Sequence, residues 1–275
     1  MKNKKWIDFL LYSNIFISIC AATITTETYL LIHSEINWLY IAFVFFSTLF
    51  LYDFPSLYFA EEAFSANQSE RHKWILENRN TLIGFSAISF LVISITVFFF
   101  PLKFILLMIP NAVLAFAYFF PQTRLRSITG LKAAVVAVVW TMVTYVYPLL
   151  LCPLTCGESW RGVSERFLFM LPLCIIFNVR DIEADRIAGV RTIPVVYGTR
   201  ATIIICLISL LLFSILVFFH RRGSAETMAL IASAIVSAIL ILKSSHNKHD
   251  YFYSFWIDGM IILQAGLVVM TSILL

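Results

Sequence analysis

The chain has 275 residues, of which 60% are hydrophobic and 13% are charged, and its formal net charge is +4. Because an average soluble domain is about a quarter charged, this composition excludes an ordinary soluble protein and favours one embedded in a lipid bilayer. Apolar runs close to or longer than the roughly 20 residues needed to cross the hydrocarbon core recur along the whole chain. We therefore expect a single all-α integral membrane domain over residues 1–275, surrounded by membrane lipids and without a nucleic-acid partner.

In chain order, the apolar runs predict nine transmembrane helices, at residues 7–32, 38–59, 82–100, 104–120, 131–151, 165–180, 201–219, 225–242 and 251–274. The first run begins like a secretory signal, but Asp8 interrupts it and it is too long for the apolar core of a signal. We therefore expect it to be kept as the first helix. A longer polar stretch, residues 61–80, follows the second run.

Lysine and arginine are distributed unequally between the two predicted sides of the membrane. With a cytoplasmic N-terminus, the inner segments hold fifteen of these residues and the outer segments hold five. Cytoplasmic loops are enriched in lysine and arginine, so this distribution supports an odd number of spans. It predicts a cytoplasmic N-terminus and an external C-terminus for a protein of the cell (inner) membrane.

A polar stretch follows the sixth apolar run and reads N-V-R-D-I-E-A-D-R-I-A-G-V-R-T-I-P-V-V-Y-G over residues 178–198. If the preceding helix continues by a turn or two, Asn178, Asp181 and Asp185 lie on one face at i, i+3 and i+7. Their oxygen atoms suit Mg²⁺, which proteins usually hold with one or two carboxylates plus the phosphate oxygens of a substrate. An ordinary charged cytoplasmic loop is the alternative that this spacing leaves open.

The run D-I-E-A-D-R-I-A-G-V-R-T-I-P within this stretch resembles the second aspartate-rich motif of the UbiA superfamily of intramembrane prenyltransferases. The resemblance implies a UbiA-like bundle of nine helices, with Mg²⁺ held on an isoprenyl diphosphate. It also implies that the isoprenyl group passes to a lipophilic acceptor, such as an aromatic or quinone-precursor molecule. By the same resemblance, Asp181 and Asp185 are the catalytic metal ligands and Asn178 assists them.

Basic residues near this motif are candidates to bind the diphosphate, because arginine meets phosphate oxygens that a metal leaves free. Within the motif stretch these are Arg180, Arg186 and Arg191. The segment Y-F-F-P-Q-T-R-L-R also resembles the tyrosine-proline-basic segment that follows the fourth helix in the family, which adds Tyr118, Arg124, Arg126 and, a little further on, Lys132. For Arg124, Arg126 and Lys132, interfacial anchoring of the positive-inside type is the alternative.

The chain departs from the family at the first motif, where relatives carry an asparagine and two aspartates at four-residue intervals. Here Asp53 and Glu61 occupy the outer positions, and Leu57 stands in the middle. Leucine cannot bind a metal, so the usual pair of Mg²⁺ ions is in doubt. Asp53 and Glu61 remain candidate ligands for one ion, and lysine or arginine in place of that ion is the alternative.

Three functions are compatible with these patterns. The first is a Mg²⁺-dependent membrane prenyltransferase, and the second is a non-catalytic relative that binds an isoprenoid lipid or a membrane partner. The third is a transporter, which is disfavoured because the carboxylates gather at one membrane face rather than near the midplane. Asp258 lies inside the last apolar run, so we expect it to face the bundle interior, either paired with a cation or protonated.

Overall fold

The computed structural model describes residues 2–58, 70–119, 129–152, 160–220 and 223–274, and every regular element within them is helical. The first half contains α1 (Lys2–Tyr12), α2 (Ile15–Leu31), α3 (Trp38–Tyr58), α5 (Glu70–Glu77), α6 (Arg79–Val97) and α7 (Leu102–Phe119). The second half contains α8 (Leu131–Thr141), η3 (Met142–Val146), α9 (Tyr147–Leu151), α10 (Trp160–Arg180), α11 (Ile182–Ile187), α12 (Ile193–Phe219), α13 (Ser224–Leu242), η4 (Phe252–Ile257) and α14 (Asp258–Leu274). The all-α class predicted from the sequence is confirmed.

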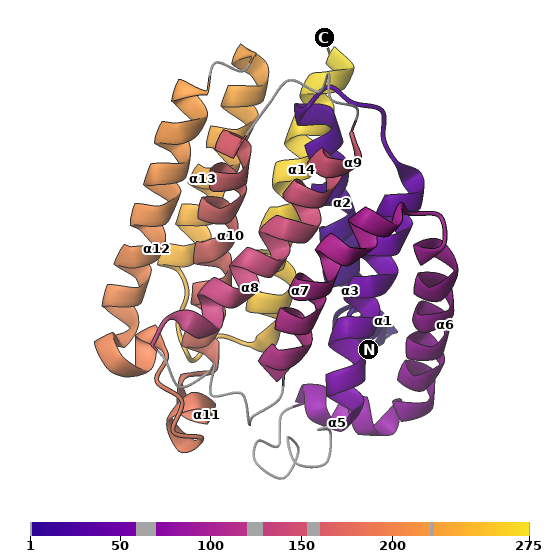
Figure 1. Ribbon diagram of the computed structural model, residues 1–275. Helices are drawn as coiled ribbons and strands as arrows, with labels where there is room; N and C mark the ends of the chain where they lie inside the picture. Colours follow the sequence, from indigo (N-terminus) through magenta and orange to yellow (C-terminus); the bar gives the residue numbers. More distant parts are fainter. Residues whose placement is uncertain (1, 59–69, 120–128, 153–159, 221–222, 275) are drawn as a thin grey trace.

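The long helices form a closed ring. Around it, α14 packs against α2, α2 against α3, α3 against α7, α7 against α8, α8 against α10, α10 against α12, and α13 against both α12 and α14. Helix α6 packs on α3 at the outside of this ring. The short helices α5 and α11 lie at one end of the bundle and the C-terminus lies at the other (Figure 1). We call the first of these the α5/α11 end.

Seven helices of the described chain are long and apolar enough to cross a membrane, and the count rises to eight if a bent pair forms one span. Their outward faces carry large exposed apolar side chains such as Phe90, Leu211 and Phe218, as expected for surfaces that contact lipid. The predicted count of nine is not confirmed, because the segment predicted at residues 104–120 corresponds to α7. Its apolar part, Leu102–Tyr118, is shorter than the other spans.

The first predicted span is broken into α1 and α2, whose axes differ by 59°. Asn14 lies at the break with a φ of 57°, in the left-handed region that asparagine tolerates better than most residues. Asn14 is buried, and its side-chain amide donates a 2.8 Å hydrogen bond to Asp53 on α3. The break therefore puts a polar side chain inside the ring instead of an uninterrupted apolar helix.

A buried ion pair joins α2 to α10 within the bundle. The Arg166 guanidinium lies 3.1 Å from Glu27, and both side chains are almost fully buried. Arg166 also donates hydrogen bonds to the carbonyl of Ile24 and the hydroxyl of Thr28, while Gln264 on α14 donates to Glu27. Removing one partner of such a pair leaves an uncompensated buried charge, so these contacts fix α2, α10 and α14 relative to one another.

Candidate functional site

The ring of helices encloses a cavity of about 420 Å³. Polar side chains at its α5/α11 end are Asn14, Arg71, Lys132, Asn178, Arg180 and Asp181. Apolar side chains line most of the remainder, among them Phe16, Leu51, Trp140, Met170, Leu173 and Ile261. Met170 and Arg180 both contribute to the wall and lie ten residues apart in α10, so the cavity extends about 15 Å along this helix.

The polar end depends on a helix break at Asp181. Helix α10 ends at Arg180, and Asp181 leaves helical geometry with φ −89° and ψ 9° before α11 begins. As a result, the three residues expected on one continuous face are separated. Asn178 and Asp181 line the cavity, whereas Asp185, on α11, is buried outside the cavity wall.

Asp181 is held by its neighbour in sequence. Arg180 donates from Nε to Oδ1 of Asp181 at 2.7 Å and from a terminal nitrogen to Oδ2 at 3.3 Å. Burial alone would raise the pKa of Asp181, but the charge and hydrogen bonds of Arg180 hold this pKa below its usual value. The carboxylate is therefore ionised at neutral pH and remains about one-third exposed.

Asp185 is paired with Lys132 rather than with another carboxylate. Nζ of Lys132 lies 2.8 Å and 3.1 Å from the two carboxylate oxygens of Asp185. Lys132, at the start of α8, also lines the cavity. Asp185 thus positions a cation at the polar end.

Tyr118 also lines the cavity, close to the C-terminal end of α7.

Two arginines of the motif stretch lie elsewhere. Arg186 is exposed and forms a 2.9 Å ion pair with Glu183 one turn earlier in α11. Arg191 is also exposed, and neither side chain belongs to the cavity wall. Three further predicted residues, Glu61, Arg124 and Arg126, fall outside the described residues.

Next to the first-motif region, Asn14 orients Arg71 towards the cavity. Asp53 is fully buried behind Asn14 and does not line the cavity. The carbonyl oxygen of the Asn14 side chain accepts a 3.0 Å hydrogen bond from Arg71 at the start of α5, and Arg71 does line the cavity. Burial and the nearby charge of Arg180 lower the pKa of Arg71, although a guanidinium stays protonated in proteins. Leu57 packs towards Ile75 and Leu82.

The donor set fits one shared Mg²⁺ ion better than a pair of ions. Within the described ranges, no three His, Cys, Asp or Glu side chains come together as a metal site. Asp181 and Asn178 both line the polar end, where the amide oxygen of Asn178 can bind a metal and its buried, unpartnered amide nitrogen can donate to a phosphate oxygen. One carboxylate and an amide are enough protein ligands for Mg²⁺ when phosphate oxygens supply others. Asp53 is enclosed behind Asn14 and does not fit a second ion at the cavity.

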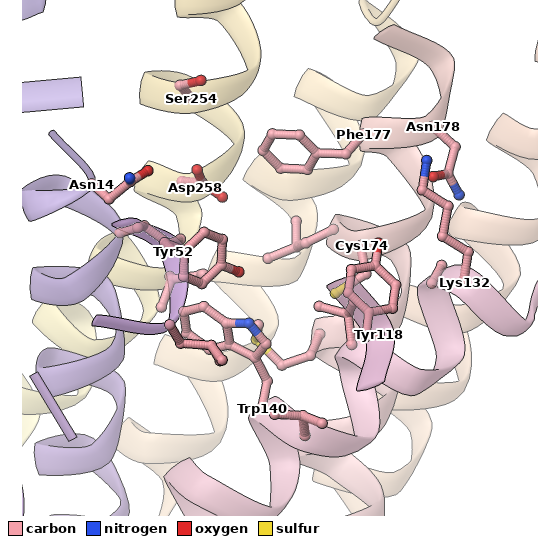
Figure 2. Close-up of a pocket in the computed structure, with 18 of the residues that line it drawn as sticks. Asn14, Tyr52, Tyr118, Lys132, Trp140, Cys174, Phe177, Asn178, Ser254 and Asp258 are labelled. Carbon is pink, nitrogen blue, oxygen red and sulfur yellow. The ribbon is translucent and has the colours of Figure 1, made fainter. Parts of the chain in front are cut away.

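Several wall residues were not identified as site residues from the sequence. Arg71 lies in the polar stretch at residues 61–80, and Asn14 lies in the first apolar run. An asparagine in an apolar run is a usable signal, because polar groups inside a membrane are costly and tend to serve a function. Tyr52, Trp140 and Ser254 carried no such signal, since aromatic and small residues are ordinary in membrane helices. Figure 2 shows Ser254, Asp258 and Asn14 on one side of the cavity, with Asn178 and Lys132 opposite and Trp140 beyond Tyr52.

Comparisons with solved structures show the fold that this chain shares. A UbiA homologue from Archaeoglobus fulgidus bound to GPP and Mg²⁺ aligns with a TM-score of 0.70 and 13% identity, covering 98% of this chain and 100% of that one. An apo UbiA homologue from Aeropyrum pernix K1 aligns at 0.57 and 13% identity, covering 98% of each chain. A structure described for digeranylgeranylglyceryl phosphate synthase aligns at 0.58 and 16% identity, covering 99% of this chain and 100% of that one.

The family assignment comes from the sequence itself. A search of curated proteins finds no match. The model of the UbiA prenyltransferase family matches residues 75–256, which is well over half of the chain and includes both Lys132 and the second aspartate-rich motif. The resemblance found in the motifs is therefore confirmed, and this chain belongs to the UbiA prenyltransferase family.

Proposed function

We propose that this integral membrane protein transfers an isoprenyl group from an isoprenyl diphosphate to a lipophilic, aromatic or quinone-precursor acceptor. The observation that carries the proposal is the two-part cavity, which has cations and one ionised carboxylate at its α5/α11 end and apolar side chains beyond. An isoprenyl diphosphate has the same division between a charged head and a hydrocarbon tail. The UbiA homologue that contains GPP and Mg²⁺ has the same fold and gives the proposal further support.

The head of the donor would lie among Arg71, Lys132 and Arg180. These side chains come from α5, α8 and α10, so they approach the diphosphate from three directions. Arg180 retains donors after pairing with Asp181, because a guanidinium has five N–H groups. Hydrogen bonds between charged partners are about twice as strong as neutral ones, and here they would hold the leaving group in place.

Asp181 and Asn178 would hold Mg²⁺ against the diphosphate, where the ion supplies positive charge to the departing oxygen. This chain's own contribution is to keep Asp181 ionised, through Arg180, and to present the Asn178 amide beside it. Asp185 would act by positioning Lys132. In place of a second ion, Arg71 would supply charge from the first-motif side.

The tail would lie along Phe16, Leu173 and Met170, with Trp140 and Tyr52 lining the same space. Burial of each CH₂ of the tail favours binding by about 0.8 kcal/mol. The same walls exclude water, so that the acceptor rather than water meets the allylic carbon once the diphosphate leaves. Aromatic faces close to that carbon also favour positive charge.

A non-catalytic relative is the second candidate, because Asp53 is enclosed and Leu57 carries no ligand atom. To separate the two, purified protein in lipid nanodiscs is incubated with labelled isoprenyl diphosphates and a panel of quinone-precursor and chlorin acceptors, with and without Mg²⁺. Mg²⁺-dependent prenylated product supports the enzyme. A donor that binds and is recovered unchanged with every acceptor supports the non-catalytic relative. A donor that does not bind contradicts both the enzyme and a relative that binds the isoprenyl donor.

A further inference from the structure

The cavity has a second polar feature besides its cationic end. Ser254 and Asp258 both line it and lie four residues apart, across the junction between η4 and α14. Residues at this spacing share a helix face, and Figure 2 shows both beside the cavity, on the side opposite Lys132 and Asn178. A π-helical turn such as η4 is uncommon and is frequently found at functional sites.

Neither side chain is used by the protein itself. Within the part of the chain that the structure describes, the Asp258 carboxylate and the Ser254 hydroxyl make no hydrogen bond or ion pair, although Ser254 is only 8% exposed. Many polar residues of the bundle donate to backbone carbonyls, as Ser209 does to Leu168 and Thr141 to Ala137, and unpartnered serines such as Ser86 and Ser89 do not line the cavity. Because buried polar groups are normally hydrogen-bonded, two that face a cavity point to a bound molecule.

The carboxyl group of Asp258 selects the kind of molecule. It offers no positive charge to a diphosphate, whose head has Arg71, Lys132 and Arg180 to bind it. A carboxylate beside a hydroxyl instead complements a group that donates a hydrogen bond. The walls around them include Phe16, which packs near Gly259, and the ring of Tyr52, so the rest of the ligand is apolar and planar.

We propose that Ser254 and Asp258 bind the hydroxyl group of an aromatic acceptor and that Asp258 accepts its proton. This inference rests on the proposed prenyl transfer. The hydroxyl proton passes to the Asp258 carboxylate, and an electron pair of the resulting phenolate bonds to the allylic carbon. The bond from that carbon to the diphosphate oxygen breaks, with its electron pair on the diphosphate. Where a ring carbon attacks, its hydrogen then moves to the oxygen, so atoms and charge balance without an oxidant.

Binding of two matched probes tests the acceptor site without requiring turnover. Full-length protein in nanodiscs is titrated with labelled 1-naphthol and with 1-methoxynaphthalene, which lacks the O–H donor, and empty nanodiscs correct for partition into lipid. Wild type is expected to bind 1-naphthol about tenfold or more tightly than the ether, as a hydrogen bond to a charged group implies. Asp258→Leu should lose this preference and Ser254→Ala should reduce it. Ser209→Ala, whose hydroxyl bonds to Leu168 away from the cavity wall, should keep it.

Binding of the isoprenyl donor is measured with the same proteins in nanodiscs. Asp258→Leu should bind geranyl diphosphate with Mg²⁺ about as tightly as wild type, because the Asp258 side chain is not among the groups proposed to bind the diphosphate. If Asp258→Leu does not fold, Asp258→Asn replaces it, since the amide keeps the size. It should retain donor binding and slow transfer to a phenol by about a hundredfold or more, as loss of a general base implies.

A wild-type protein that binds both naphthalenes equally, or an Asp258→Leu protein that keeps the hydroxyl preference, overturns the acceptor site and leaves donor binding unaffected. Failure of wild type to bind geranyl diphosphate instead contradicts the proposed function, whatever the naphthol result.

Discussion

Nζ of Lys132 lies 2.8 Å from Oδ1 of Asp185, so the carboxylate of the second motif is paired with a lysine from the start of α8. This contact joins α11 to the start of α8 and directs a cation towards the polar end of the cavity. Asp181, four residues earlier, faces the same cavity with its carboxylate about one-third exposed. The two aspartates of the motif are therefore placed for different tasks.

Asp181→Asn and Asp185→Asn should consequently differ in how they affect donor binding. Asp181→Asn should remove most of the Mg²⁺-dependent binding of geranyl diphosphate, at least about tenfold, because the charge that attracts the metal is lost. Asp185→Asn should weaken binding to a similar extent with Mg²⁺ and with EDTA, because it releases Lys132 rather than a metal. Isothermal titration in both conditions gives the comparison.

Glu183→Gln is the matched control, since Glu183 lies on the same short helix but is exposed and pairs with Arg186. It should change neither titration. If Asp185→Asn abolished only the Mg²⁺-dependent part, Asp185 would be a metal ligand and the Lys132 pair would have to open on binding.

Arg71 gives a second prediction. Arg71→Ala should weaken geranyl diphosphate binding by about ten- to a hundredfold even with EDTA present, because a charge-assisted hydrogen bond is lost. Arg71→Lys should recover part of the affinity, since it keeps the charge but not the planar fork of donors. Arg186→Ala, which removes an exposed arginine outside the cavity wall, is the control. Equal losses in Arg71→Ala and Arg186→Ala would indicate a general charge effect and not a bound guanidinium.

The sequence predicted the helical membrane class and the family because both depend on local patterns. Runs of apolar residues identify spans, and the D-I-E-A-D-R segment identifies the motif. The sequence did not predict the break at Asp181, because the residues before and after it are ordinary helix formers and α11 resumes immediately. Continuous helical spacing therefore placed Asp185 on the wrong face relative to the cavity.

The sequence also did not predict the contacts between distant parts of the chain. The bond from Asn14 to Asp53 joins residues 39 positions apart, and the pair of Lys132 with Asp185 joins residues 53 apart. No periodicity within one segment reports such pairs, because they depend on how the helices pack. Asp258 was expected to face the bundle interior, and it does, but only the cavity shows what it faces there.

Membrane orientation gives a third prediction. The excess of lysine and arginine in the segments at the α5/α11 end predicts that this end of the bundle faces the cytoplasm, with the C-terminus on the opposite side. A reporter active only in the cytoplasm, fused after Met1 or after Leu275, should therefore be active at the N-terminus and inactive at the C-terminus. Activity at both ends would require an even number of spans and would contradict the proposed orientation.

The last prediction concerns Leu57, where the chain departs from its relatives. Restoring a carboxylate with Leu57→Asp should not create a second metal site, because Leu57 packs towards Ile75 and Leu82 and is absent from the cavity wall. The substitution should instead lower the free energy of unfolding by about 0.5–3 kcal/mol, because an apolar contact is replaced by a partly buried charge. Thermal unfolding in nanodiscs measures this loss.

A Mn²⁺ titration, followed by electron paramagnetic resonance in the presence of geranyl diphosphate, counts the ions that are bound. Wild type and Leu57→Asp should both bind one ion per chain, and Asp181→Asn should bind none tightly. Asp53→Asn should leave the count at one. Asp53→Asn should nevertheless weaken the binding of geranyl diphosphate, because Asn14 loses the carboxylate that orients it towards Arg71. Two ions in wild type would contradict the single-ion arrangement, and a second ion gained only by Leu57→Asp would show that α3 can turn Leu57 towards the cavity.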